Sequence, residues 1–191
     1  MIGADARMLM KLWLRSPRRI ATIAPSGRNV CGGLLKDLPR ATSGWVVELG
    51  AGTGPVTTAL LDAGLPPSRL LAVEANPDLA ARLRARFGDD IVACHDATDM
   101  PTLFDRRGIN RVAAIISTLP ILNMPAVAQR AIIDGCFQRA ESGATMTQIT
   151  YMPGSPVASK RLHAWGYRAD IAHFAWRNLP PATVWRYQRA R

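Results

Sequence analysis

The sequence predicts an α/β protein with a seven-stranded, mainly parallel sheet. Three observations lead to this prediction. Short β-branched stretches alternate with helix-like segments from residue 45 to residue 152, a glycine-rich loop joins the first strand to the helix after it, and two more strands are expected near the carboxyl end. This alternation is typical of parallel strands whose connecting helices cover both faces of the sheet. In such sheets a ligand binds beyond the carboxyl ends of the strands.

Local patterns place each element. Five apolar, β-branched runs predict strands at 45–49, 69–76, 90–97, 111–118 and 144–152. Helices are expected at 54–64, 77–88 and 126–141, where Pro77 opens the second helix and Gly88 closes it. The segment 166–191 alternates aromatic and basic residues around a Pro-Pro turn. We therefore expect two antiparallel strands, joined through Asn178–Pro181, that close the sheet as an edge hairpin.

The composition indicates one domain and a polyanionic partner. The chain has 191 residues, a net charge of +10 and a pI of about 10.7, so it is attracted to nucleic acid or to an anionic membrane surface. Three isolated cysteines, without a C-x-x-C or H-E-x-x-H pattern, predict a reducing compartment and no metal site. Without a membrane-spanning apolar run or a secretion signal, we expect a cytoplasmic protein.

The segment Asp5–Arg15 predicts an amphipathic, basic helix that ends at Pro17. Arg7, Lys11 and Arg15 are spaced four apart and form one stripe. The remaining arc is apolar and contains Met8, Leu9, Met10, Leu12, Trp13 and Leu14. Such a helix lies in a membrane interface, with its cations at headgroup phosphates, or it packs on the domain as an ordinary first helix. The helix alone leaves both interpretations open.

The loop Gly50-Ala51-Gly52-Thr53-Gly54 does not complete the G-x-G-x-x-G pattern of dinucleotide-binding proteins, because Pro55 stands where the last glycine is required. It therefore favours a cofactor without a pyrophosphate. Acids stand at the strand ends around it. Glu48 suits a cationic ligand group, Glu74 can accept both hydroxyls of a ribose, and Asp96 can accept an adenine amino proton.

These motifs, in this order and spacing, resemble the class I S-adenosylmethionine-dependent methyltransferases, which have a Rossmann-like fold. The stretch "VVELGAGTG" resembles their glycine motif, "VEAN" their ribose-binding acid and "HDA" their adenine loop. The resemblance implies S-adenosylmethionine as cofactor and S-adenosylhomocysteine as product. It implies cofactor binding by Glu48, Gly50, Ala51, Gly52, Gly54, Glu74, Ala75, Asp96, Ala97 and Ser117.

The segment after the fourth strand helps to distinguish between kinds of methyltransferase. Many amino-methyltransferases carry an Asn/Asp-Pro-Pro-Tyr or Asn-Leu-Pro-Tyr motif there, whose ring stacks on a base. This chain has Ser117-Thr118-Leu119-Pro120 followed by Ile121. An enzyme that flips a base needs a flat stacking platform. The missing ring therefore argues against an rRNA adenine N6-methyltransferase.

Six segments together resemble the small bacterial phospholipid N-methyltransferases: "APSG", "ELGAGTGPVT", "VEANPDLAARLRARF", "STLPILNMP", "ITYMPGSPV" and "NLPPATVWRY". The resemblance implies methylation of phosphatidylethanolamine through its mono- and dimethylated forms to phosphatidylcholine, at the inner face of the cytoplasmic membrane. It implies a membrane-associating helix in residues 1–20 and a methyltransferase domain in residues 21–191. The membrane contacts implied are Arg7, Met8, Leu9, Lys11, Leu12 and Trp13. We expect a monomer without metal or nucleic acid.

Methyl transfer needs an acceptor nitrogen with a lone pair, held about 3 Å from the methyl group. Tyr151, Ser117 and the backbone carbonyls around Leu119 are the candidates for holding it, and Tyr151 fits core packing equally well. His95 acts as a base or only lines the adenine pocket. Cations available to a lipid phosphate are Arg28, Lys160, Arg161, Arg177 and Arg186. An ornithine-headed lipid, an rRNA adenine and a non-catalytic, membrane-docked regulator remain as alternatives.

Overall fold

The computed structural model describes residues 31–35, 38, 43–152, 154–175 and 181–190. The predicted N-terminal helix lies outside the described residues, so its membrane role stays a prediction. The same holds for the predicted membrane contacts and two of the phosphate-binding candidates: Arg7, Met8, Leu9, Lys11, Leu12, Trp13, Arg28 and Arg177.

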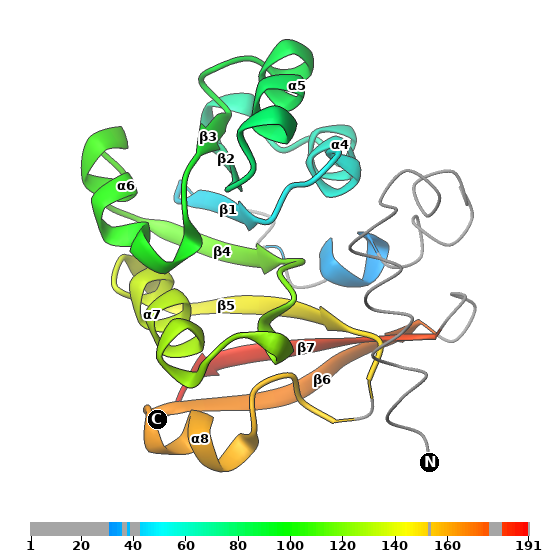
Figure 1. The fold of residues 1–191 in the computed structure, drawn as a ribbon, viewed down its shortest axis with the longest axis vertical. Helices are drawn as coiled ribbons and strands as arrows, with labels where there is room; N and C mark the ends of the chain where they lie inside the picture. The colour runs from blue at the N-terminus through cyan, green and yellow to red at the C-terminus, as the bar shows by residue number, and fades with distance from the viewer. Residues whose placement is uncertain (1–30, 36–37, 39–42, 153, 176–180, 191) are drawn as a thin grey trace.

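Seven strands form one sheet in the order β3-β2-β1-β4-β5-β7-β6 (Figure 1). The parallel strands are β1 (Trp45–Leu49), β2 (Leu70–Glu74), β3 (Val92–Cys94), β4 (Val112–Ser117) and β5 (Ala140–Thr150). β7 (Ala182–Arg189) is antiparallel to both β5 and β6 (Tyr167–Ala175) and lies between them. The predicted fold class and the antiparallel hairpin are confirmed. Of the two hairpin strands, β6 forms the sheet edge and β7 is an inner strand.

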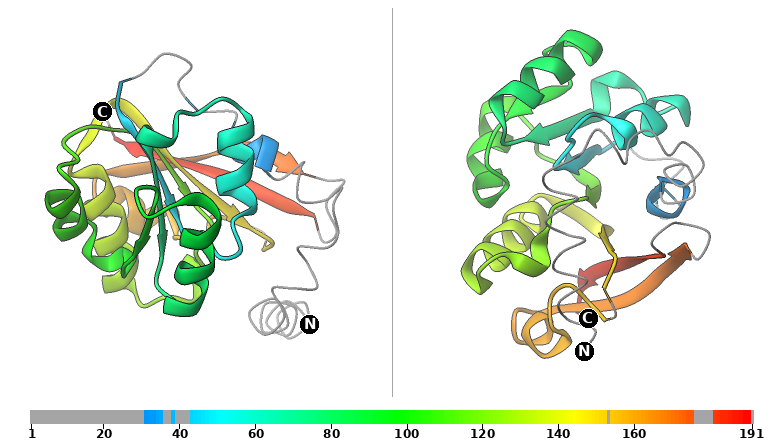
Figure 2. Two further views of the ribbon diagram at one scale, coloured as in Figure 1. Left: turned by 90° about the horizontal axis from the view of Figure 1, so that it is seen from above. Right: turned by 45° about the vertical axis from the view of Figure 1, so that its right-hand side comes forward.

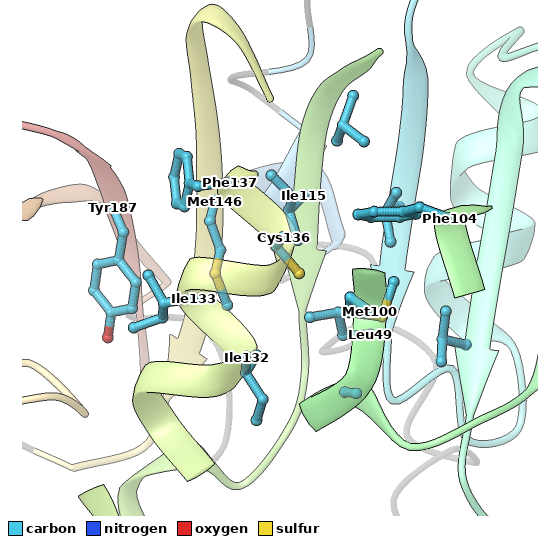
Figure 3. Close-up of a cluster of buried hydrophobic side chains, with 14 of the residues drawn as sticks. Leu49, Met100, Phe104, Ile115, Ile132, Ile133, Cys136, Phe137, Met146 and Tyr187 are labelled. Carbon is cyan, nitrogen blue, oxygen red and sulfur yellow. The ribbon is translucent and has the colours of Figure 1, made fainter. Parts of the chain in front are cut away.

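Helices cover both faces of the twisted sheet (Figure 2). On one face, α4 (Pro55–Asp62), α5 (Pro77–Phe87) and the helical residues 31–35 pack in a cluster that contains Leu34, Leu60 and Leu83. On the other face lie α6 (Met100–Arg107), α7 (Ala126–Phe137) and α8 (Ser159–Ala164). Figure 3 shows the core of this second face, where side chains of α6 and α7 meet side chains of β1, β4, β5 and β7.

Three helical segments were not predicted: α6, α8 and residues 31–35. Two strand ends also differ from their expected positions. α6 has Pro101 in its first turn, where proline is tolerated because that N–H has no partner within the helix. β3 ends at Cys94, so Asp96 lies beyond the strand, and β5 begins at Ala140, before the expected start at Ala144. Gly143, with a φ of 82°, interrupts the apolar pattern at that point.

One row of residues crosses the sheet near its carboxyl edge. Leu49 on β1 pairs with Ser117 on β4, Ser117 with Gln148 on β5, and Gln148 with Trp185 on β7. Paired residues of neighbouring strands point to the same face. This row, called the carboxyl-edge row below, therefore shares one face of the sheet, next to the edge where parallel sheets bind their ligands.

Candidate active site

The glycine loop folds over the end of β2. Gly50, Gly52 and Gly54 adopt φ angles of 75°, 58° and 85°, which favour glycine. The N–H groups of Gly50 and Ala51 donate to the Val73 carbonyl at 2.9 and 3.1 Å. α4 begins directly after the loop. The backbone thus passes close across the carboxyl ends of β1 and β2, at the edge where parallel sheets bind their ligands.

Gly54 is also fixed by packing. A Cβ at this position would lie 2.6 Å from Cε2 of Phe87 and 2.9 Å from Cδ2 of Leu83. We expect Gly54→Ala to lower the free energy of unfolding by about 3 kcal/mol, from left-handed strain and overpacking together. Gly108→Ala is the matched control, since its φ is 64° and no atom lies within 4 Å of its Cβ, so only the strain of about 1 kcal/mol applies. Urea unfolding measures both, and equal losses would contradict the packing argument.

Glu74, at the end of β2, ties the glycine loop to the start of α5. Its Oε2 accepts from the N–H of Gly52 at 2.8 Å, and its Oε1 accepts from the N–H of Asn76 at 2.9 Å. Asn76 in turn caps α5, because its Oδ1 accepts from the N–H groups of Asp78 and Leu79. Each carboxylate oxygen keeps a lone pair, so Glu74 can also accept hydroxyl donors of a ligand.

Glu48 is a fully buried acid on β1, on the face that α4 covers. Thr57 Oγ1 donates to its Oε2 at 2.6 Å, while its Oε1 accepts no hydrogen bond among the described residues. Burial raises the pKa of Glu48 to about 8, and the hydrogen bond from Thr57 opposes this rise. A buried carboxyl with an unpaired oxygen beside a ligand loop is a candidate binding site for a cationic group, whose charge would favour the ionised carboxylate.

Asp96 caps a 3₁₀ turn, Ala97–Asp99, just beyond β3. Its Oδ1 accepts from the N–H and the hydroxyl of Thr98, both at 2.8 Å, and these hydrogen bonds lower the pKa of Asp96. His95 Nε2 donates to the Asp99 carbonyl at 2.7 Å. The imidazole is therefore tied to the same turn, which favours the pocket-lining interpretation of His95 over a role as base.

The loop after β4 is fastened to the glycine loop. Thr118 Oγ1 donates to the Gly50 carbonyl at 2.7 Å, and the Thr118 N–H donates to the Leu49 carbonyl at 3.0 Å. Leu119 covers Gly50, since a Cβ there would lie 2.9 Å from Leu119 Cδ2. Ser117 is fully buried at the base of this loop. Two candidates from the sequence, Ser117 and Leu119, are thereby brought together with the glycine loop.

The other catalytic and phosphate-binding candidates come from later elements of the chain. Tyr151 follows β5 and packs, half-buried, against the cluster under α4 and α5. Arg161 Nη1 donates to Gln129 Oε1 at 3.0 Å, and Arg186 forms an ion pair with Asp170. Lys160 is exposed on α8. Two of the proposed phosphate ligands are thus already engaged by protein groups.

Sequence reasoning missed four residues that shape the site: Thr57, Thr118, Gln129 and Gln148. The two glutamines are 2% and 1% exposed. Gln129 Nε2 donates to the Ile121 and Met124 carbonyls at 2.8 and 3.2 Å and so holds the turn after β4. A polar residue within an otherwise apolar strand, as at Gln148 in "ATMTQITYM", is the signal that could have found it.

No family model matches the chain. Two solved structures share its fold at 14% sequence identity. The methyltransferase CcbJ from Streptomyces caelestis superposes with a TM-score of 0.65, over 87% of this chain and 90% of that one. The glycopeptide N-methyltransferase MtfA, in complex with S-adenosylmethionine, superposes with a TM-score of 0.61, over 84% of this chain and 87% of that one.

A relative by sequence decides the family. The ornithine lipid N-methyltransferase of Singulisphaera acidiphila is 34% identical over 167 residues, which make up 85% of each chain. The chain belongs to the class I S-adenosylmethionine-dependent methyltransferases. The cofactor of this methyltransferase is S-adenosylmethionine, which supplies an electrophilic methyl group on a sulfonium.

The residues of the site fit this cofactor. Its amino group matches the buried acid Glu48, whose Oε1 accepts no hydrogen bond among the described residues. Its ribose hydroxyls match the remaining lone pairs of Glu74. Within the described part of the methyltransferase, no group of three His, Cys, Asp or Glu residues can hold a metal ion. The helices of this part are too short or too polar to cross a bilayer.

Proposed function

We propose that this methyltransferase transfers methyl groups from S-adenosylmethionine to the headgroup amine of a membrane aminolipid. The observation that carries the proposal is the alignment of 85% of the chain with an ornithine lipid N-methyltransferase. That relative favours an ornithine headgroup, whereas the motifs from "APSG" to "NLPPATVWRY" favour phosphatidylethanolamine and its methylated intermediates. Both headgroups present a primary aliphatic amine, which is the group to which the proposal commits.

In this proposal the cofactor is held at the carboxyl edge of β1, β2 and β3. Glu48 pairs with its amino group, Glu74 accepts from its ribose, and Asp96 accepts from its adenine. The hydrogen bonds that fix the glycine loop and the two acids support this assignment. The complete set is Glu48, Gly50, Ala51, Gly52, Gly54, Glu74, Ala75, Asp96, Ala97 and Ser117.

The acceptor must reach the site as a neutral amine, because an ammonium has no lone pair. The ammonium first releases a proton to solvent. The nitrogen lone pair then forms the new N–C bond while the C–S bond breaks, and its electron pair passes to sulfur. The loop from Ser117 to Leu119 excludes water and orients the amine. The ring of Tyr151 is a candidate for cation–π contact with the methylated ammonium, worth about 0.5–2 kcal/mol.

A membrane surface is proposed as the second partner. The turn and helix that follow the Ser117–Leu119 loop expose Leu122 and Val127, at 38% and 77% of their surface. A net charge of +10 attracts the protein to anionic headgroups. We therefore propose peripheral association at the inner face of the cytoplasmic membrane, with residues 1–20 as a further contact. This association weakens as salt screens the charges.

Transfer of labelled methyl groups tests the function. The purified protein is incubated with S-adenosylmethionine and anionic vesicles that contain phosphatidylethanolamine, ornithine lipid or neither, and with unmodified rRNA in a separate arm. We expect label in at least one aminolipid and none in the vesicles without an amine. Label in rRNA instead would establish the second candidate, an rRNA adenine methyltransferase. Cofactor binding without transfer in any arm would indicate a regulator.

A further inference from the structure

Gln148 is a buried amide beside the loop that follows β4. Its Nε2 donates to the carbonyls of Leu119 and Ile149, both at 2.9 Å. Because a carbonyl oxygen only accepts, exchanging the oxygen and nitrogen of the amide would leave oxygens facing one another. The orientation of the amide is therefore fixed, and Oε1 points away from both carbonyls.

Oε1 of Gln148 is buried and, within the described residues, accepts no hydrogen bond. Nε1 of Trp185, its neighbour in the carboxyl-edge row, is also buried and lacks a partner in the same part of the chain. Buried polar groups are nearly always paired, since leaving one unpaired costs free energy. One unpaired acceptor and one unpaired donor on neighbouring strands indicate a ligand that carries the complementary groups.

The Leu119 carbonyl was a candidate from the sequence for holding the acceptor amine. It already accepts two hydrogen bonds. One comes from Gln148 Nε2 and the other from the N–H of Ile121 at 2.8 Å. These occupy both lone pairs of the carbonyl. The Leu119 side chain meanwhile contacts the glycine loop at Gly50. Gln148 is thus separated from the cofactor loop by a single residue, and its Oε1 is the acceptor that remains.

We propose that Gln148 and Trp185 form the headgroup site. Gln148 Oε1 accepts a hydrogen bond from the N–H of the methyl-acceptor amine. Trp185 Nε1 donates to an anionic oxygen of the same headgroup, a phosphate in phosphatidylethanolamine or a carboxylate in an ornithine headgroup. The inference rests on the proposed function and names the residues that recognise its substrate.

This arrangement makes Gln148 selective for the number of methyl groups already on the amine. Primary and secondary amines carry an N–H in their reactive, neutral form, so Gln148 orients them. A dimethylated amine carries none. Gln148 therefore favours the first two transfers over the third, whereas Trp185, which binds the anionic oxygen, acts on all three alike.

Variants at two glutamines test the selectivity. For Gln148→Met we expect kcat/KM to fall about tenfold more for the unmethylated lipid than for its dimethylated form, because only the former loses a hydrogen bond. The matched control is Gln129→Met, which also removes a buried glutamine side chain whose amide donates hydrogen bonds to carbonyls of the turn after β4. We expect this control to lower kcat/KM for the unmethylated and the dimethylated lipid by the same factor. Trp185→Phe raises KM for both lipids together. If Gln148→Met lowers kcat/KM equally for both lipids, the proposal is overturned and Gln148 has only a structural role.

A measurement on the wild-type protein covers the case in which Gln148→Met does not fold. We expect phosphoethanolamine to shift the NMR resonances of both the Gln148 side-chain amide and the Trp185 indole N–H. Phosphocholine, which lacks an N–H, shifts only the indole. For a protein that methylates only ornithine lipid, ornithine and its trimethylated form replace these probes. Absence of any shift with saturating headgroup overturns the site, whereas absence of lipid methylation by the wild type contradicts the proposed function itself.

Discussion

Replacing Glu74 by alanine is expected to weaken S-adenosylmethionine binding about 100-fold. The substitution removes the two hydrogen bonds that hold the glycine loop and the start of α5, to Gly52 at 2.8 Å and to Asn76 at 2.9 Å. It also removes the proposed ribose acceptor. Hydrogen bonds to a charged group contribute about 1.5–3 kcal/mol each, and about 2.7 kcal/mol corresponds to 100-fold in affinity.

Isothermal titration calorimetry with S-adenosylmethionine measures this effect. Asp78→Ala is the matched control, because it removes an exposed carboxylate from the first turn of the same helix. We expect the control to bind the cofactor like the wild type. Glu74→Gln keeps one acceptor oxygen and is expected to fall between the two. If Glu74→Ala binds within about threefold of the wild type, the assignment of the cofactor site at β2 is wrong.

Replacing Glu48 by glutamine is expected to stabilise the cofactor-free protein at high pH and to weaken cofactor binding. Burial raises the pKa of Glu48 to about 8 from its ordinary value of 4.5. When folding raises the pKa of a group, the group contributes its full stabilisation at a pH below its pKa in the unfolded state. This contribution is lost as the pH rises toward the pKa in the folded state. The wild type therefore loses stability between about pH 4.5 and pH 8 by a few kcal/mol, and Glu48→Gln does not.

Thermal unfolding across this pH range tests the prediction. We expect the Tm of Glu48→Gln to exceed that of the wild type by roughly 10 °C at high pH, with the difference vanishing toward pH 5. At neutral pH the variant is expected to bind S-adenosylmethionine about tenfold more weakly, because the neutral amide no longer pairs with the amino group. A Tm difference that does not change with pH would show that Glu48 does not titrate in this range.

The sheet was predictable because its signals are local. Strands β1, β2 and β4 are mainly apolar runs, and α5 carries both a proline at its start and a glycine at its end. The helix α8 is only six residues long, which leaves too few turns for a clear periodicity. The helix α6 has eight residues, as α4 has, but no glycine loop marks its start. The start of β5 was misplaced because Gly143 interrupts its pattern.

The sequence predicts residues of the proposed cofactor site only where a local motif carries them. Glu48 and Glu74 lie at strand ends and Asp96 lies two residues beyond β3, near the carboxyl edge where parallel sheets bind their ligands. Contacts between distant segments could not be predicted in the same way. Gln148 meets Leu119 across 29 residues of sequence, and Thr118 meets Gly50 across 68. No local pattern encodes such pairs, since they depend on how β4 lies in register with β1 and β5.

Mass spectrometry of the lipids of a host cell tests the central claim most directly. The host contains phosphatidylethanolamine and ornithine lipid but makes no N-methylated lipid, and it expresses either the wild type or Glu74→Ala. With the wild type, methylated forms of at least one of the two aminolipids are expected to appear, and with Glu74→Ala their amount falls sharply at equal protein level. Unchanged lipids in cells that contain folded, cofactor-binding wild-type protein would contradict the assignment of a lipid amine as the methyl acceptor.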